Sequence, residues 1–287
     1  MKKRFLDYTR LVKFEHTIFA LPFALIGFFL AVVQGSGVLS FVLLLKVIGC
    51  MVFARNAAMG FNRYLDRRFD AANPRTAMRE IPAGVVSPKK ALIFVVVNSL
   101  LFMGTSWLIN ALCFYLSPVA LLVILGYSYM KRVTPLCHFV LSSGLALAPI
   151  GAYLAVAGQF AIAPLLFSIV VFFWVSGFDI IYACQDVEFD RTYQLKSVPA
   201  ILGIKRALQL SVFVHLIATA FVLSAGFILH SGWLYWVGAT IFIGLLSYQH
   251  LIIKPTNLSR VNLAFGTTNG IASVIFATFV IASFYLK

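Results

Sequence analysis

The sequence predicts an all-α polytopic membrane protein with about nine transmembrane helices. The chain has 287 residues, of which 61% are hydrophobic and 11% charged, whereas soluble domains carry roughly 25% charged residues. Its mean hydropathy is +0.96. Apolar stretches of about 20 residues, which is the length that crosses a bilayer as a helix, recur along the whole chain. A single integral-membrane domain is therefore expected over residues 1–287.

Each apolar stretch is interpreted as one transmembrane helix. The first, near residues 18–33, is followed by no small-residue cleavage site, so we expect a retained span rather than a signal peptide. The predicted spans are residues 17–34, 40–62, 91–110, 114–130, 139–157, 163–185, 207–229, 232–253 and 262–285.

Basic residues fall in every second connection between these spans. The connections after the second, fourth, sixth and eighth spans carry 7, 2, 4 and 2 Lys or Arg, and the N-terminal segment carries 5 more. The other four connections carry none. The positive-inside rule therefore places the N-terminus and the basic connections in the cytoplasm. This topology accounts for most of the net charge of +14, and we expect the remaining positive charge to bind an anionic substrate. No nucleic-acid partner is needed to explain it.

Cysteine and histidine provide no metal-binding pattern. The four cysteines and five histidines are dispersed, without a C-x-x-C pair or the spacing of a metal site. We expect the cysteines to be small buried residues and most of the histidines to be structural.

The segment FNRYLDRRFD, residues 61–70, ends the second span and opens the predicted cytoplasmic loop 63–90. It carries Asn62, Asp66 and Asp70 at four-residue intervals, which places all three side chains on one face of a helix. This is the first acidic motif.

The segment FDIIYACQDVEFD, residues 178–190, repeats this arrangement before the predicted cytoplasmic loop 191–206. Its last two aspartates align with those of the first motif, and its tyrosine aligns with the asparagine, at an offset of about 120 residues, so an internal pseudo-repeat is expected. One helical face is predicted to carry Asp179, Tyr182, Asp186 and Asp190.

The two motifs together predict a site for Mg²⁺ and a diphosphate. If the two helices face each other, four carboxylates line one pocket, which is costly near a bilayer unless a cation lies between them. Mg²⁺ suits such oxygen ligands and completes its shell with water and phosphate oxygens. Phosphate oxygens would also bind nearby basic side chains, namely Arg63, Arg67, Arg68, Arg75, Arg79, Arg191 and Lys196. The alternative is that each acid simply pairs with a neighbouring arginine.

These motifs resemble those of a known enzyme family. NRYLDRRFD and QDVEFD, together with NPRTAMREIPAG, YSYMKRVT, DIIYACQDVEFD and KFEHTIFALPFAL, resemble the UbiA-type intramembrane aromatic prenyltransferases, of which the 4-hydroxybenzoate polyprenyltransferases are an example. The resemblance covers essentially the whole chain. It implies nine helices around a central cavity that opens to the cytoplasm and to lipid, in a bacterial cytoplasmic (inner) membrane. It also implies Mg²⁺-dependent transfer of a polyprenyl group from its diphosphate to an aromatic acid, in ubiquinone or menaquinone biosynthesis.

The resemblance also implies residue roles. The family's motif aspartates hold Mg²⁺–diphosphate, and here they are Asp66, Asp70, Asp186 and Asp190, with Asn62 assisting. Asp179 is a candidate for the base that removes the ring proton, or a structural partner of Arg55. Candidate substrate-binding residues are Asn62, Arg55, Arg67, Arg75, Arg79, Tyr127, Lys131, Arg132, Tyr182, Arg191 and Lys196, of which Arg132 matches a position associated with the acceptor carboxylate.

One departure leaves the acceptor open. Many 4-hydroxybenzoate relatives have Asn-Asp where this chain has Asn62-Arg63, and the Asn-Arg form with NPRT is common in a subgroup linked to menaquinone. The alternatives are therefore 1,4-dihydroxy-6-naphthoate, a non-aromatic acceptor, or, from the intramembrane acids alone, a transporter.

Overall fold

The computed structural model describes residue 11, residues 19–35 and residues 38–286, and forms no β-strand in this part of the chain. The predicted all-α fold is therefore confirmed. The chain divides into two compact units, one comprising Met1–Thr17 with Val42–Tyr129 and the other Ile18–Phe41 with Met130–Lys287. The start of the first predicted span and all five basic residues of the N-terminal segment lie outside the described residues.

The first unit is built on three long helices, α3 (Phe41–Ala72), α4 (Pro88–Trp107) and most of α5 (Ala111–Val133). Asn56 on α3 donates its side-chain amide to the Asn98 carbonyl on α4 at 3.0 Å. One turn further on, Gly60 lets the two helices approach, because a Cβ at this position would lie 3.1 Å from Val95 and 3.2 Å from Phe94. The packing holds α3 against α4 just before the first acidic motif.

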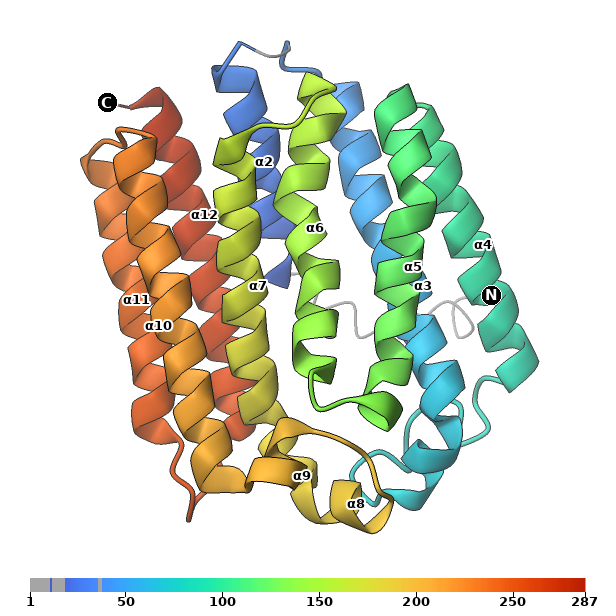
Figure 1. The fold of residues 1–287 in the computed structure, drawn as a ribbon. Helices are drawn as coiled ribbons and strands as arrows, with labels where there is room; N and C mark the ends of the chain where they lie inside the picture. Colours follow the sequence, from blue (N-terminus) through green and yellow to red (C-terminus); the bar gives the residue numbers. More distant parts are fainter. Residues whose placement is uncertain (1–10, 12–18, 36–37, 287) are drawn as a thin grey trace. The chain divides into compact units, whose positions relative to one another are not determined.

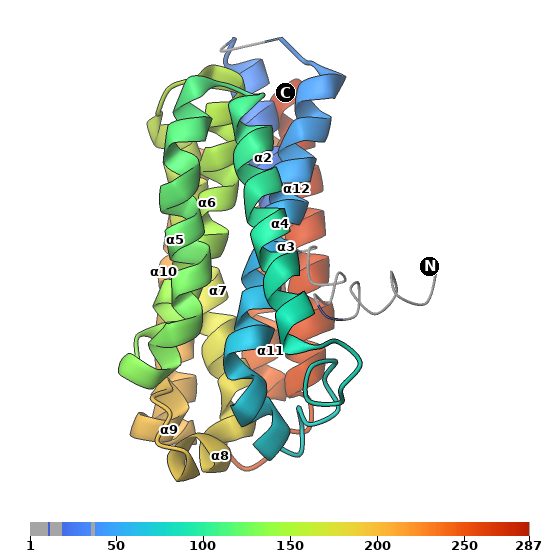
Figure 2. The same cartoon turned by 90° about the vertical axis from the view of Figure 1, so that its right-hand side faces the viewer.

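The second unit contains the other long helices and the shorter segments that follow α7. Its main helices are the shorter α2 (Leu21–Val33) and the longer α6 (Cys137–Ala157), α7 (Ile162–Ala183), α10 (Ile204–Ile228), α11 (Trp233–Ile252) and α12 (Asn269–Tyr285). A 3₁₀ turn η2 (Cys184–Asp186) and the short helices α8 (Val187–Thr192) and α9 (Val198–Leu202) follow α7. Both views place α8 and α9 beyond the lower end of α7 (Figures 1 and 2).

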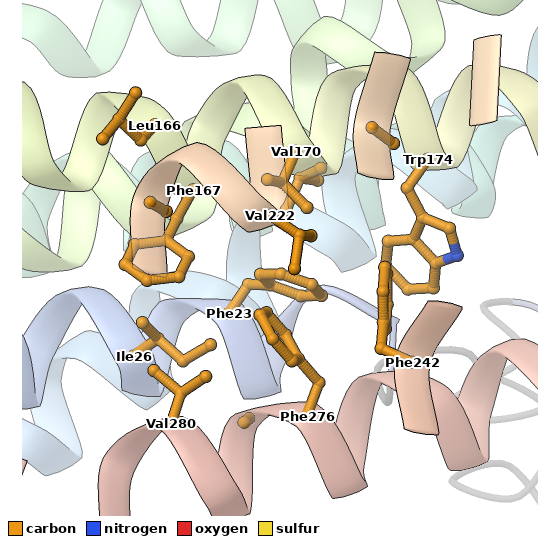
Figure 3. Packing of buried hydrophobic residues seen from close by; sticks show 14 of the residues in the cluster. Phe23, Ile26, Leu166, Phe167, Val170, Trp174, Val222, Phe242, Phe276 and Val280 are labelled. Carbon is orange, nitrogen blue, oxygen red and sulfur yellow. The ribbon is translucent and has the colours of Figure 1, made fainter. Parts of the chain in front are cut away.

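Large aromatic side chains form the core of the second unit. Phe23, Trp174, Phe242 and Phe276 are fully buried and come from α2, α7, α11 and α12. Their rings pack at centroid distances of 5.3 Å for Phe23–Trp174 and 4.9 Å for Phe242–Phe276, within the range that aromatic pairs favour. Figure 3 shows these rings meeting between the helices. The core packs against α7, which carries Asp179 near its C-terminal end.

Helix length and hydropathy identify an integral membrane protein. Seven helices in the described part are long and apolar enough to cross a bilayer, and α2 is a shorter apolar helix. Each predicted span overlaps a helix, although the count of nine membrane crossings stays a prediction.

Two predicted loop boundaries were wrong. Helix α3 continues to Ala72, so the first motif lies within a helix and the connection to α4 begins after it, not at residue 63. Similarly, α8 reaches Thr192 and α9 occupies part of the predicted loop 191–206. Hydropathy marks where lipid ends, whereas a helix ends only where its backbone hydrogen bonds end.

The second motif does not lie on one continuous helix. Helix α7 ends at Ala183, the 3₁₀ turn over Cys184–Asp186 follows, and Asp190 lies on the separate helix α8. A 3₁₀ turn has three residues per turn instead of 3.6, so the four-residue spacing no longer keeps side chains on one face. The predicted shared face is therefore interrupted between Tyr182 and Asp186.

Candidate functional site

The first acidic motif forms the column that its spacing predicts. On the continuous helix α3, the Asn62 side-chain amide donates to Asp66 Oδ2 at 3.0 Å. Both residues are half-buried. An amide carbonyl and a carboxylate therefore lie side by side, and both are oxygen ligands of the kind that Mg²⁺ prefers.

Asp70, the last member of this motif, is buried in an ion pair. It is 6% exposed, and Arg79 Nη1 lies 2.6 Å from its Oδ1. Arg63 Nη1 lies 4.0 Å from the other oxygen. Arg63 is itself 3% exposed and donates to the Leu11 carbonyl at 3.5 Å. Asp70 is therefore paired with neighbouring arginines, which is the alternative to a bound cation that the sequence left open.

Asp190, the last member of the second motif, is held in the same way by groups of its own unit. It has no exposed surface, and Lys131 Nζ lies 2.7 Å from its Oδ1. Ser197 donates its hydroxyl to Oδ2 at 2.6 Å. The backbone strengthens this contact, because Lys196 N–H donates to the Lys131 carbonyl at 2.6 Å. Asp186 is also buried, at 8% exposure.

Asp179 and Tyr182 lie on the last turns of α7 and contact residues that the motifs do not contain. His138 Nδ1 lies 2.7 Å from Asp179 Oδ2. The Tyr182 ring lies 4.1 Å, centroid to centroid, from Phe265. Phe265 belongs to η3, a π-helical stretch over Leu263–Thr268 that directly precedes α12, and π-helical turns are frequent at functional sites.

The remaining predicted binding residues lie around the two motifs in their respective units. Arg67 places its guanidinium 4.6 Å from the Tyr64 ring centroid and donates to the Tyr64 carbonyl at 2.6 Å. Arg191 donates to the Ala200 carbonyl at 2.9 Å, and Lys196 Nζ to the Val133 carbonyl at 3.0 Å. Arg75 is exposed, whereas three further residues are half-buried on α3 and α5, namely Arg55, Tyr127 and Arg132.

Three residues that make these contacts were not predicted from the sequence. His138 was treated as structural, and Phe265 was not separated from the other phenylalanines. Ser197 carried a usable signal, because a serine just before Val-Pro is a typical helix N-cap, and here its Oγ accepts from Ala200 N at 3.3 Å. The signals for His138 and Phe265 are not local, since their partners lie far away in the sequence.

The oxygen ligands of the two motifs suit Mg²⁺ that is also coordinated by water and phosphate, better than a metal ion coordinated by protein side chains alone. No three His, Cys, Asp or Glu side chains cluster as a metal site among the residues that the structure describes. Mg²⁺ needs no such cluster, because it usually takes one or two carboxylates and completes its shell with water and phosphate oxygens. The bonded, half-buried pair Asn62–Asp66 fits this chemistry, whereas Asp70 and Asp190 already face cationic side chains.

Comparisons with known proteins agree with the motifs. The family model described as "UbiA prenyltransferase family" matches residues 20–280. The chain is 30% identical over 247 residues to a protein of Tolumonas auensis named 4-hydroxybenzoate octaprenyltransferase, covering 86% of each chain. The apo structure of a UbiA homolog from Aeropyrum pernix K1 superimposes with a TM-score of 0.84 at 30% identity, covering 93% of this chain and 98% of that one.

A structure of a UbiA homolog from Archaeoglobus fulgidus, bound to DMAPP and Mg²⁺, shares the fold at 21% identity with a TM-score of 0.76, covering 98% of this chain and 100% of that one. The family model and the 30% identical relative both indicate a prenyltransferase, so they do not support the transporter alternative. The chain belongs to the UbiA prenyltransferase family, as its motifs predict, and is a prenyltransferase.

Proposed function

We propose that this protein transfers a polyprenyl group from a prenyl diphosphate to an aromatic acid of the 4-hydroxybenzoate type, for respiratory quinone synthesis. The observation that carries this proposal is the 30% identity, over 86% of each chain, to a protein named for that reaction. The proposed site lies on the cytoplasmic side of a bacterial inner membrane, with the N-terminus in the cytoplasm. The bilayer supplies the polyprenyl substrate.

The two acidic motifs would serve the diphosphate. We assign Asn62, Asp66 and Asp186 to the binding of the Mg²⁺ that arrives with this substrate, and Asp70 and Asp190 as further ligands that must exchange their basic partners. When bound, the ion stabilises the negative charge of the leaving diphosphate. Arg67 and Arg79, with the other basic residues named above, add fixed positive charge to the phosphate oxygens.

The rest of the reaction depends on positioning. Loss of the diphosphate leaves an allylic cation, which must meet an electron-rich ring before it meets water. Tyr127 and Lys131 correspond to the family's Y-x-x-x-K motif, and Arg132 would bind the acceptor carboxylate. Tyr182, with its ring against Phe265, offers an aromatic face to the cation.

The second candidate acceptor is 1,4-dihydroxy-6-naphthoate. It is favoured by the Asn62-Arg63 sequence where many 4-hydroxybenzoate relatives have Asn-Asp. However, Arg63 is 3% exposed and bonded to the Leu11 carbonyl, so it has little surface with which to select an acceptor. A non-aromatic acceptor remains a more remote alternative.

The test uses membranes that contain the full chain, with Mg²⁺ and labelled geranyl diphosphate. Each aromatic acid is offered separately, and Asp66→Asn and Asp186→Asn are compared with Glu188→Gln, an exposed acid on α8. We expect one acceptor to be prenylated, and the activity to be lost on chelation and in both aspartate variants but not in Glu188→Gln. Prenylation of neither acid would overturn the aromatic-acid assignment.

A further inference from the structure

One buried histidine is bonded directly to a carboxylate of the second motif region. His138 lies in the first turn of α6, is 3% exposed, and places Nδ1 2.7 Å from Asp179 Oδ2. The Asp179 side chain keeps 20% of its surface exposed. The histidine is therefore enclosed, whereas the carboxylate that it contacts can still be reached.

The second ring nitrogen fixes the direction of this hydrogen bond. Val198 N–H, in the first turn of α9, donates to His138 Nε2 at 3.3 Å. A nitrogen that accepts a hydrogen bond carries no proton, so the neutral ring carries its proton on Nδ1. His138 therefore donates to Asp179, and the carboxylate remains the acceptor.

The surrounding contacts hold this histidine in place from both sides. Cys137 Sγ donates to the Lys196 carbonyl at 3.5 Å, and Ser142 Oγ donates to the His138 carbonyl at 2.6 Å. The segment that presents Val198 also presents Ser197, which is bonded to Asp190. One imidazole thus connects Asp179 to the segment that holds the last motif aspartate.

We propose that His138 is a positioning residue that aims the Asp179 carboxylate to accept the proton released from the aromatic ring. This inference rests on the proposed function. After the allylic cation has bonded to the ring carbon beside the hydroxyl, the C–H electron pair at that carbon returns to the ring and restores aromaticity. The proton passes to the Asp179 carboxylate, which becomes a carboxylic acid and later releases the proton to water. The Nδ1–H donor holds one carboxylate oxygen, so the group keeps a single orientation.

The test is the hydrogen isotope effect on turnover by the full chain in membranes. Light acceptor and acceptor deuterated at the ring carbons beside the hydroxyl are assayed separately at saturation, because carbon–carbon bond formation precedes proton loss. The ratio of the two kcat values does not depend on how much of a variant is folded, since both rates come from one preparation. The variants are His138→Leu, His138→Asn, whose amide N–H can replace Nδ1–H, and His250→Asn as the matched control. His250 is a half-buried histidine bonded to His215 at 2.8 Å.

For His138→Leu we expect kcat to fall roughly 10- to 100-fold, as for other hydrogen-bond partners that orient a functional side chain, and the isotope ratio to rise clearly above the wild-type ratio. The KM for the prenyl diphosphate should change little. His138→Asn should recover most of the kcat and the wild-type ratio, and His250→Asn should keep both. An unchanged isotope ratio in His138→Leu, or no recovery in His138→Asn, would overturn this inference alone. A wild-type protein that prenylates no aromatic acid would overturn the proposed function and this inference with it.

Discussion

Lys131 Nζ lies 2.7 Å from Asp190 Oδ1, and that carboxylate has no exposed surface. The first motif repeats the relationship, with Arg79 Nη1 2.6 Å from Asp70. In each unit, the last motif aspartate is thus compensated by a basic side chain of the same unit. This compensation removes much of the cost of keeping four carboxylates near a bilayer. From the sequence we expected a bound cation in this role, with pairing to neighbouring arginines as the alternative.

Replacing Lys131 by Met should destabilise the protein, because Asp190 would be left buried with Ser197 as its one side-chain partner among the described residues. An unsatisfied buried group costs about 1–3 kcal/mol, and more when charged. Thermal unfolding in detergent would measure the loss. The double variant Lys131→Met with Asp190→Asn should recover much of the stability, because the uncompensated charge is gone. Equal stability of Lys131→Met and wild type would contradict the importance of this ion pair.

Gly27→Ala should separate α2 from α6. A Cβ at Gly27 would collide with the backbone carbonyl of Pro149 on α6, and backbone cannot move aside as a flexible side chain can. Overpacking of this kind typically costs about 1–3 kcal/mol. The matched control is Gly151→Ala on the same α6, where a Cβ meets nothing within 4 Å. We expect a lower unfolding temperature for Gly27→Ala but not for Gly151→Ala. Similar values for both would show that α2 and α6 can move apart enough to admit a Cβ at Gly27.

Asn269→Leu should disrupt the π-helical stretch that presents Phe265. Asn269 donates to the Ala264 carbonyl at 2.8 Å and to the Phe265 carbonyl at 3.3 Å, and it accepts from Trp174 Nε1 at 2.9 Å. Its loss leaves a fully buried indole N–H and helix carbonyls without this partner, which costs about 1–3 kcal/mol for each group. We expect a lower unfolding temperature and a shifted tryptophan emission.

The control for this variant is Asn262→Leu, which changes an exposed asparagine just before the π-helical stretch. It should leave both observables near wild type. If Asn262→Leu had the same effect as Asn269→Leu, the hydrogen bonds of Asn269 would not be the cause.

The sequence predicted features that depend on local periodicity and on composition. The four-residue spacing of Asn62 and Asp66 predicted a shared face, and their 3.0 Å hydrogen bond on the uninterrupted helix α3 confirms it. The same spacing failed between Tyr182 and Asp186, because the 3₁₀ turn over Cys184–Asp186 changes the number of residues per turn. Nothing in the local hydropathy marks that change.

Contacts between residues that lie far apart in the chain could not be predicted from the sequence. His138 and Asp179 are 41 positions apart. The sequence around a single histidine in an apolar segment does not indicate which residue it contacts. The tilted contact between the Phe265 and Tyr182 rings depends on the helical register before α12, which hydropathy does not report. The domain extent, the residue roles and the membrane orientation stay predictions.

Removing Arg79 should reveal whether Asp70 can exchange its arginine for a metal-bound diphosphate. Among the described residues, Arg79→Leu leaves the 6%-exposed carboxylate with the weaker contact to Arg63, 4.0 Å away, so we expect a lower unfolding temperature. A ligand that binds the folded state stabilises it, and a cation delivered to Asp70 should do so most where the arginine is missing. Mg²⁺ with a non-hydrolysable geranyl thiodiphosphate should therefore raise the unfolding temperature more in Arg79→Leu than in wild type, because compensating the buried Asp70 charge outweighs the phosphate contact that Arg79 would make. The control Lys89→Leu removes an exposed basic side chain in the first turn of α4, in the same unit, and should match wild type in both conditions. If the ligand gave Arg79→Leu no larger gain than wild type, Asp70 would be a structural partner of Arg79, and the assignment of diphosphate binding would be left to Asp66 and Asp186.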